Sequence, residues 1–75
     1  MGEFNNIAMS GSNLKFYMNQ KNITVEELAR GTGISERSIN RYRTGERLPD
    51  IGGAYAIAAY LQMDLKQIWC VFDKN

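Results

Sequence analysis

Four polar residues in one short stretch carry side chains that can read the base edges of DNA. Arginine can bond the O6 and N7 atoms of guanine at two points, asparagine suits adenine, and glutamate can accept from the amino group of cytosine. Glu36 and Asn40 are four residues apart, and so are Arg37 and Arg41. On a helix, that spacing places both pairs on one face. We expect these four residues to read bases, although the same residues also suit an exposed helix held by surface ion pairs.

The helix that carries them is predicted over residues 36–43. Ser35 precedes it and has a side chain that can cap its N-terminus. Ile39 and Tyr42 are three residues apart and share the opposite, apolar face. A short helix that is cationic on one side and buried on the other suits insertion into the major groove.

A second helix, expected over residues 25–31, precedes the first and would hold it in place. Thr24 and Glu27 have the spacing of a capping box at its start. Gly33 stands where the chain must turn between the two helices, a position that favours a residue free to take positive φ. Residues 24–44 therefore predict two short helices joined by a tight turn.

This stretch resembles the helix-turn-helix of the Cro/repressor family of small DNA-binding regulators. The resemblance runs from about residue 14 to residue 69 and continues through a loop with glycine then proline and two closing helices: Gly45, Pro49, Ala58, Ala59, Tyr60, Leu61, Leu65 and Ile68. It implies a compact, all-α, lambda-repressor-like domain of five helices, in which the second and third form the helix-turn-helix.

The remaining helices follow from caps and apolar spacing. The first is expected from Ser12 to about residue 20, the fourth over residues 51–61 after Asp50, and the fifth after Asp64, carrying Leu65, Ile68, Trp69 and Phe72. Leu48, in the loop before the fourth helix, is expected in the core. No strand-like alternation is visible, so no sheet is expected.

The domain is expected to span residues 12–73, after a flexible N-terminal segment at 1–11 and before a tail at 74–75. The first four residues, MGEF, resemble an expression remnant. The N-terminal ten residues contain no lysine or arginine, which argues against an arm that binds DNA.

Positive charge is concentrated around the expected recognition helix. The whole chain has a net charge of only +1, which is low for a DNA-binding protein. Residues 30–47, however, hold five arginines and two glutamates, whereas the rest of the chain has a net charge of −2. Such a local excess is typical of a nucleic-acid footprint, and a solvated arginine-rich face is the alternative.

Several classes of function are disfavoured by composition. The 75 residues form one domain, with no histidine and a single cysteine, so neither a zinc site nor an intrachain disulfide is expected. No nucleophile–base pair or phosphate-binding loop is visible, so we expect no enzyme and no cofactor. No apolar run could span a membrane, and a cytoplasmic location is expected.

Contacts to the DNA backbone are expected where the helices begin and in the loop that follows them. The expected phosphate-contacting residues are Thr24, Val25, Ser35, Arg43, Thr44 and Arg47. The sequence departs from the family here, because many members carry glutamine where Val25 stands. Family members often pair an arginine with a glutamate at the positions that Met18 and Arg43 occupy, and the change frees Arg43 to reach a phosphate.

The expected function is sequence-specific binding of double-stranded DNA by a transcriptional regulator, most simply a repressor on a palindromic operator. A core of this size cannot absorb all three of the large apolar side chains near the C-terminus, which are Trp69, Val71 and Phe72. They therefore predict a homodimer face. In the alternative interpretation, Trp69 closes the core. A second functional class is a protein-binding module of the same fold, such as an antitoxin.

Overall fold

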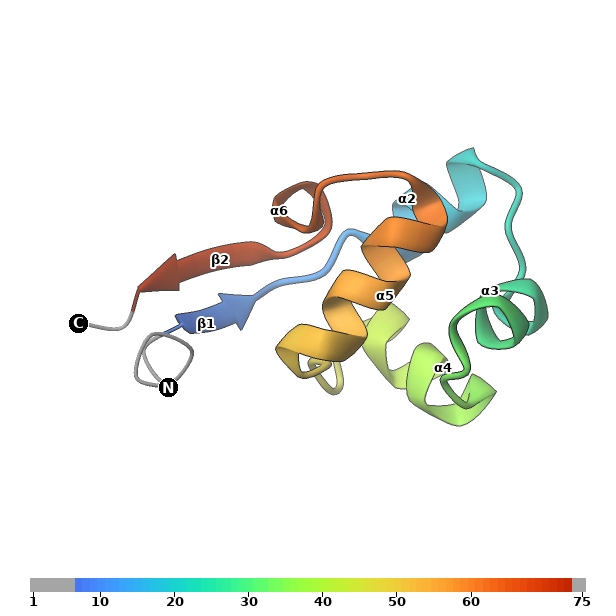
Figure 1. Ribbon diagram of the computed structural model, residues 1–75, viewed down its shortest axis with the longest axis horizontal. Helices are drawn as coiled ribbons and strands as arrows, with labels where there is room; N and C mark the ends of the chain where they lie inside the picture. The colour runs from blue at the N-terminus through green and yellow to red at the C-terminus, as the bar shows by residue number, and fades with distance from the viewer. Residues whose placement is uncertain (1–6, 74–75) are drawn as a thin grey trace.

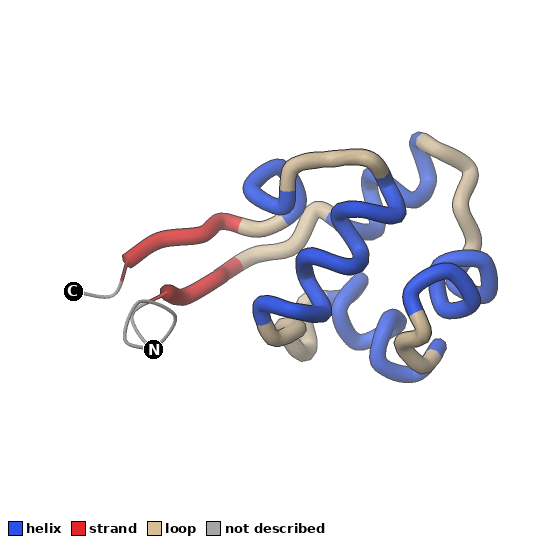
Figure 2. The backbone as a smooth tube through the Cα atoms, viewed as in Figure 1, coloured by secondary structure: helices blue, strands red, loops and turns tan. Residues whose placement is uncertain are grey.

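Five helices form one body, and two short strands form a ribbon at one end of it (Figures 1 and 2). The computed structural model describes the backbone of residues 7–73 and the side chains of residues 11–71. In chain order the elements are β1 (Ile7–Ser10), α2 (Leu14–Gln20), α3 (Val25–Thr32), α4 (Glu36–Thr44), α5 (Ile51–Leu61), α6 (Leu65–Ile68) and β2 (Cys70–Asp73). The five-helix, all-α body that the sequence predicts is confirmed.

Side-chain caps define where the later helices begin. The Ser35 side chain accepts a hydrogen bond from the Ser38 amide at 3.1 Å, and Asp50 Oδ1 accepts one from the Gly53 amide at 2.7 Å. These bonds satisfy amides that lack an acceptor within the helix. The start of the first helix differs from the prediction: α2 begins at Leu14, with Asn13 as its N-cap, and the Asn13 side chain makes no cap bond. The Ser12 hydroxyl nevertheless accepts a 3.3 Å hydrogen bond from the Leu14 amide.

Gly33 and Gly45 end α3 and α4 in left-handed backbone conformations, with φ of 77° and 79°. A side chain at such a position would crowd the backbone, so glycine is favoured there. The turn predicted at Gly33 is confirmed.

The expectation that the chain has no sheet is wrong for the segments that flank the helices. β1 and β2 pair antiparallel in a continuous register, from Ile7 opposite Asp73 to Ser10 opposite Cys70. The strand at residues 7–10 belongs to the segment expected to be flexible, whereas residues 1–6 and the tail at 74–75 lie outside the described residues. Because the two strands are far apart in sequence, no local sequence pattern predicts that they pair.

The last helix is shorter than predicted. It ends at Ile68, and Trp69 already has an extended backbone, with φ of −126° and ψ of 150°. Neither Trp69 nor Phe72 therefore lies on the helix, contrary to the sequence prediction. Val71 and Phe72 favour a strand because branched and aromatic side chains fit a pleated surface well.

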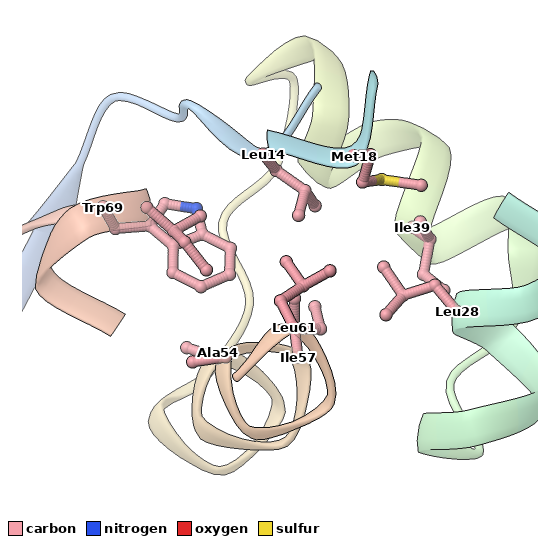
Figure 3. Packing of buried hydrophobic residues seen from close by; sticks show 10 residues of the cluster. Leu14, Met18, Leu28, Ile39, Ala54, Ile57, Leu61 and Trp69 are labelled. Atoms are coloured by element: carbon pink, nitrogen blue, oxygen red, sulfur yellow. The ribbon is translucent and has the colours of Figure 1, made fainter. Parts of the chain in front are cut away.

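The core lies where the helices meet (Figure 3). Among the described side chains, ten buried apolar residues come from every helix and from the residue after the last one: Leu14, Met18, Leu28, Ile39, Ala54, Ile57, Ala58, Leu61, Ile68 and Trp69. Trp69 is 1% exposed, so it closes the core, as the alternative interpretation held. Leu48 was expected in the core but is 38% exposed, while its neighbour Pro49 is buried instead.

Candidate nucleic-acid interface

α3 and α4 form a rigid helix–turn–helix pair. Buried Leu28 and Ile39 contribute one apolar residue from each helix to the shared core. In the turn, the Thr32 hydroxyl donates to the Leu28 carbonyl at 2.7 Å and accepts from the Ile34 amide at 3.2 Å. These bonds fix the direction in which the chain leaves α3, and so the position at which α4 begins.

The far end of α4 is tied to the start of the first helix. The Ser12 hydroxyl donates a 2.9 Å hydrogen bond to the Tyr42 carbonyl, and the Asn13 amide donates to the Ile68 carbonyl at 2.8 Å. The Tyr42 carbonyl, in the last turn of α4, also accepts from the Gly45 amide at 3.3 Å, so Ser12 gives it a second donor where the regular helical bonds end. α4 is therefore held at both ends while its outer face stays free.

The outer face of α4 presents the four candidate base-reading side chains. Glu36, Arg37 and Asn40 are exposed, and Arg41 is half-buried. The structure brings the four together on one helix, as the spacing predicts. Their use in reading bases is not tested by this arrangement and remains a proposal.

Two of these four side chains have partners in the free protein. Arg41 Nε lies 3.9 Å from Glu46 Oε2, and both side chains are substantially solvated. Asn40 Oδ1 accepts a 3.1 Å hydrogen bond from the Arg43 guanidinium. A long, exposed ion pair contributes little to stability, so Arg41 can exchange Glu46 for DNA at small cost.

Arg43 also lines a cavity of about 330 Å³ that lies between three helices. Met18 from α2, the residues that follow it, and Thr24 and Val25 at the start of α3 form the rest of the wall. Arg43 Nε is buried and has no hydrogen-bond partner within the described part of the chain. The cavity therefore brings an unsatisfied cationic donor beside the amides at the start of α3, which attract anions.

The hydroxyls at the starts of α3 and α4 already serve as helix caps. Thr24 Oγ1 accepts from the Glu27 amide at 3.1 Å, and the Glu27 carboxylate accepts from the Thr24 amide at 2.9 Å, which completes the predicted capping box. Ser35 Oγ accepts from the Ser38 amide and also donates to the Ser38 hydroxyl at 3.0 Å. Their first role is structural, and a phosphate would be met mainly by the backbone amides nearby.

Thr44, the last residue of α4, has a hydroxyl that already makes hydrogen bonds, and Arg47 in the loop beyond it has an exposed side chain. The Thr44 hydroxyl donates to the Arg41 carbonyl at 3.1 Å and accepts from the Glu46 amide at 3.3 Å. Arg47 is exposed, and its backbone amide donates to the same Arg41 carbonyl at 3.3 Å. Thr44 thus shapes the loop, while the Arg47 side chain is available for a phosphate.

A family model described as helix-turn-helix matches residues 14–68. This range runs from the first residue of α2 to the last residue of α6. The chain belongs to the Cro/C1-type helix-turn-helix family. A comparison with curated proteins found no match.

As a Cro/C1-type helix-turn-helix protein, the chain is a DNA-binding transcription regulator whose partner is double-stranded DNA. Within the described residues, no helix is long and apolar enough to cross a membrane. Both strands of the ribbon lie outside the matched range. The ribbon is thus a feature of this chain that the family match does not describe.

The three residues of the predicted dimer face are placed differently in the structure. Trp69 is buried within its own domain and cannot offer its indole to a partner in this conformation. Val71 is half-buried, and the side chain of Phe72 lies outside those that the structure describes. The sequence analysis did not predict the cavity beside Arg43. The feature of the sequence that could have indicated it is the replacement of the family's usual ion pair by Met18 and Arg43, which both line the cavity.

Proposed function

We propose that the protein is a repressor that binds a palindromic operator as a homodimer. The observation that carries this proposal is the outer face of α4, where Glu36, Arg37 and Asn40 are exposed beside Arg41. With α4 in the major groove, these side chains meet base edges. Repression then follows from occupancy, because a bound dimer blocks access to an overlapping promoter.

The backbone contacts fix the register of α4 in the groove. Arg47 reaches a phosphate from the loop, and the first amides of α3 meet another. Val25 contributes its backbone there, since its side chain cannot donate. Thr24, Ser35 and Thr44 shape the chain around these contacts and add to them through backbone groups or the remaining capacity of their hydroxyls.

Arg43 replaces the anchor that the Val25 side chain cannot supply. Arg43 lines the cavity beside the start of α3, and its buried Nε has no hydrogen-bond partner within the described part of the chain. A phosphate oxygen at this position satisfies the donor and draws the guanidinium away from Asn40. That exchange frees Asn40 for an adenine, so backbone binding and base reading are coupled through one side chain.

The test is selection of bound sequences from a random pool of DNA duplexes by the full chain. We expect an inverted repeat whose half-sites are about one helical turn, roughly 34 Å, apart. A single unrepeated site would overturn the palindromic dimer. If no sequence is enriched, a protein-binding module such as an antitoxin takes the place of the regulator.

Repression is tested separately from binding. The selected operator is placed across a promoter that drives a reporter gene, and the protein is expressed in the same cells. We expect reporter output to fall, and to recover when the two half-sites are scrambled. A rise in output would make the protein an activator while leaving the DNA-binding assignment intact.

A further inference from the structure

The cavity beside Arg43 has room for a small organic molecule. Its volume of about 330 Å³ lies at the lower end of the roughly 300–1,000 Å³ over which protein cavities hold small-molecule ligands. Its walls are of two chemical kinds, with apolar side chains from Met18, Ile23 and Val25 and polar side chains that include Asn19, Asn22 and Arg43. Such a cavity suits a molecule that has an apolar body and one polar end.

The apolar wall is held in place by the core and by the backbone. Met18 is 2% exposed, and the half-buried Ile23 and Val25 pack against the core. The Ile23 amide donates to the Met18 carbonyl at 2.9 Å, which fixes the chain between α2 and α3. The flexible thioether of methionine adapts to the shape of a ligand and makes favourable contacts with aromatic rings. The apolar part of the cavity is therefore formed before any ligand arrives.

Arg43 supplies the polar end with an unsatisfied pair of neighbouring donors. Its bond to Asn40 uses Nη1, and its buried Nε has no partner within the described part of the chain. In a guanidinium, the Nε hydrogen and one Nη2 hydrogen point in the same direction from the edge away from Nη1. A carboxylate accepts from two such donors at once, since its two oxygens match their spacing.

The charges around the cavity favour a ligand with a single negative charge. Arg43 is the one charged residue among the described residues that line the cavity. Glu26 and Glu27 follow Val25 directly, in the first turn of α3, and their carboxylates oppose a second negative charge. A carboxylate with an apolar body fits these conditions better than an inorganic phosphate, which carries more charge and has no apolar surface.

We propose that this cavity binds a small organic monocarboxylate, which acts as an inducer by weakening the hold of the protein on its operator. The carboxylate accepts from the Nε–Nη2 edge of Arg43, and the apolar body packs on Met18, Ile23 and Val25. Because Nε is covered in the free protein, binding includes a small turn of the guanidinium. That turn exchanges an unsatisfied donor for a satisfied one and is therefore favourable.

The ligand and DNA require different arrangements of Arg43. A carboxylate on the Nε edge leaves Nη1 bonded to Asn40, whereas the phosphate of the proposed function draws the guanidinium away and frees Asn40. Two ligands that favour different states of one protein weaken the binding of each other. The inference rests on the proposed function and adds its regulation, because a rise in the acid releases the operator.

The first experiment follows the Arg43 Nε–H group of the full-length protein by NMR without DNA. The probes are phenylacetate and isovalerate, the matched uncharged controls are phenylacetamide and isovaleramide, and inorganic phosphate tests for a general anion site. We expect at least one acid to shift the Arg43 Nε–H and Val25 amide resonances with a dissociation constant of roughly 1 mM or below. We expect the amides and phosphate to bind roughly tenfold more weakly or worse.

Two outcomes of this titration would overturn the ligand site. One is the absence of saturable shifts with either acid at about ten times that concentration. The other is binding of phosphate or of the amides as tightly as the acids, because the cavity would then select no carboxylate.

A matched pair of arginine variants separates the guanidinium in the cavity from net charge. Arg43→Met removes the donor edge, whereas Arg30→Met removes one positive charge from an exposed position on α3 outside the cavity lining. We expect Arg43→Met to weaken acid binding roughly tenfold or more and Arg30→Met to leave it within twofold of wild type. Equal losses in the two variants would assign the effect to overall charge and overturn the site.

The second experiment measures affinity for the selected operator with and without saturating acid at constant ionic strength. We expect the acid to weaken binding about fivefold or more. The control is Asn19→Phe, which fills the rim of the cavity and keeps Arg43, and whose operator affinity should not respond to the acid. If the acid saturates the cavity of the wild type but changes its operator affinity by less than twofold, the proposed regulation is wrong.

The two experiments allow the ligand site and the proposed function to fail independently. A protein that binds the acid through Arg43 but selects no duplex would overturn the proposed function and leave the ligand site standing. An enriched inverted repeat together with no acid binding would overturn the ligand site and leave the function standing.

Discussion

Arg37 and Arg47 are both exposed arginines, yet they stand at positions with different access to DNA. Arg37 lies in the first turn of α4, and Arg47 lies in the loop beyond it. We expect Arg37→Ala to cost about 1–3 kcal/mol on the selected operator and to relax the preference at one base pair. We expect Arg47→Ala to weaken all sequences about equally and to lower the salt slope by roughly one unit.

The measurement is binding of both variants to the operator and to a scrambled duplex at two salt concentrations. Arg37→Lys should restore only part of the loss, because an ammonium lacks the paired geometry of a guanidinium. Equal losses for Arg37→Ala and Arg47→Ala on both duplexes would reduce Arg37 to a phosphate contact.

Replacing Arg43 is expected to affect the stability of the domain and its binding to DNA in opposite ways. Its buried Nε has no partner, and such a donor costs about 1–3 kcal/mol. We expect Arg43→Met to unfold in urea at the wild-type midpoint or higher, while binding of operator and scrambled DNA weakens to a similar degree. Wild-type affinity in Arg43→Met would show that Arg43 meets no phosphate.

At the scale of the elements, two glycines are predicted to respond to alanine with opposite signs. Gly33 ends α3 at a φ of 77°, where a side chain is strained by about 1–2 kcal/mol. Gly52 lies in α5 and has open space for a methyl group, with only Asp50 Oδ1 nearby at 3.7 Å. We expect Gly33→Ala to lower the free energy of unfolding and Gly52→Ala to raise it by about 0.5–1 kcal/mol.

Urea denaturation of both variants tests this prediction directly. Because each change adds one methyl group, the pair controls for the added apolar surface. If both variants are destabilised by the same amount, the effect of alanine depends on the position of each glycine near a helix end and not on its backbone conformation.

The helices were predictable from sequence because their signals are local. The capping box at Thr24 and Glu27, the glycine at 33 and the caps at Ser35 and Asp50 all lie within a few residues of the boundaries they define. The ribbon was not predictable in this way. Its two strands depend on each other across the whole chain, and neither has an alternating pattern long enough to stand out.

The candidate site was predictable to a similar extent. Helical periodicity placed Arg37 and Asn40 on the outer face of α4, where the structure has them. The hydrogen bond from Arg43 to Asn40 and the cavity beside it depend on rotamers and on packing between three helices. Sequence spacing carries no information about either of them.

At the scale of the whole molecule, Trp69 has the largest effect we predict on stability. It is the largest of the fully buried side chains, and removing such a group costs about 3–5 kcal/mol. A domain of 75 residues has a total stability of only about 4–11 kcal/mol. We expect Trp69→Ala to be largely unfolded or close to it at 37 °C, as circular dichroism would show.

The control for this variant is Phe16→Ala. Phe16 is also aromatic but is 60% exposed, and its ring packs nearly at right angles to that of Tyr17, with the centroids 5.1 Å apart. Its removal should change the free energy of unfolding by about 0.5 kcal/mol or less, as is usual at the surface. A stable, fully helical Trp69→Ala protein would contradict the buried position that the structure gives Trp69.

The pairing of β1 with β2 also sets an order of events in folding. The strands that meet are at least 60 residues apart in sequence, whereas the turns and caps of the helices close over a few residues. Closing the longest loop costs the most chain entropy before it yields any contact, and local contacts form faster. The helical body therefore folds first, and the two strands of the ribbon pair last. A chain emerging from the ribosome thus completes its DNA-reading surface before its two end strands can meet.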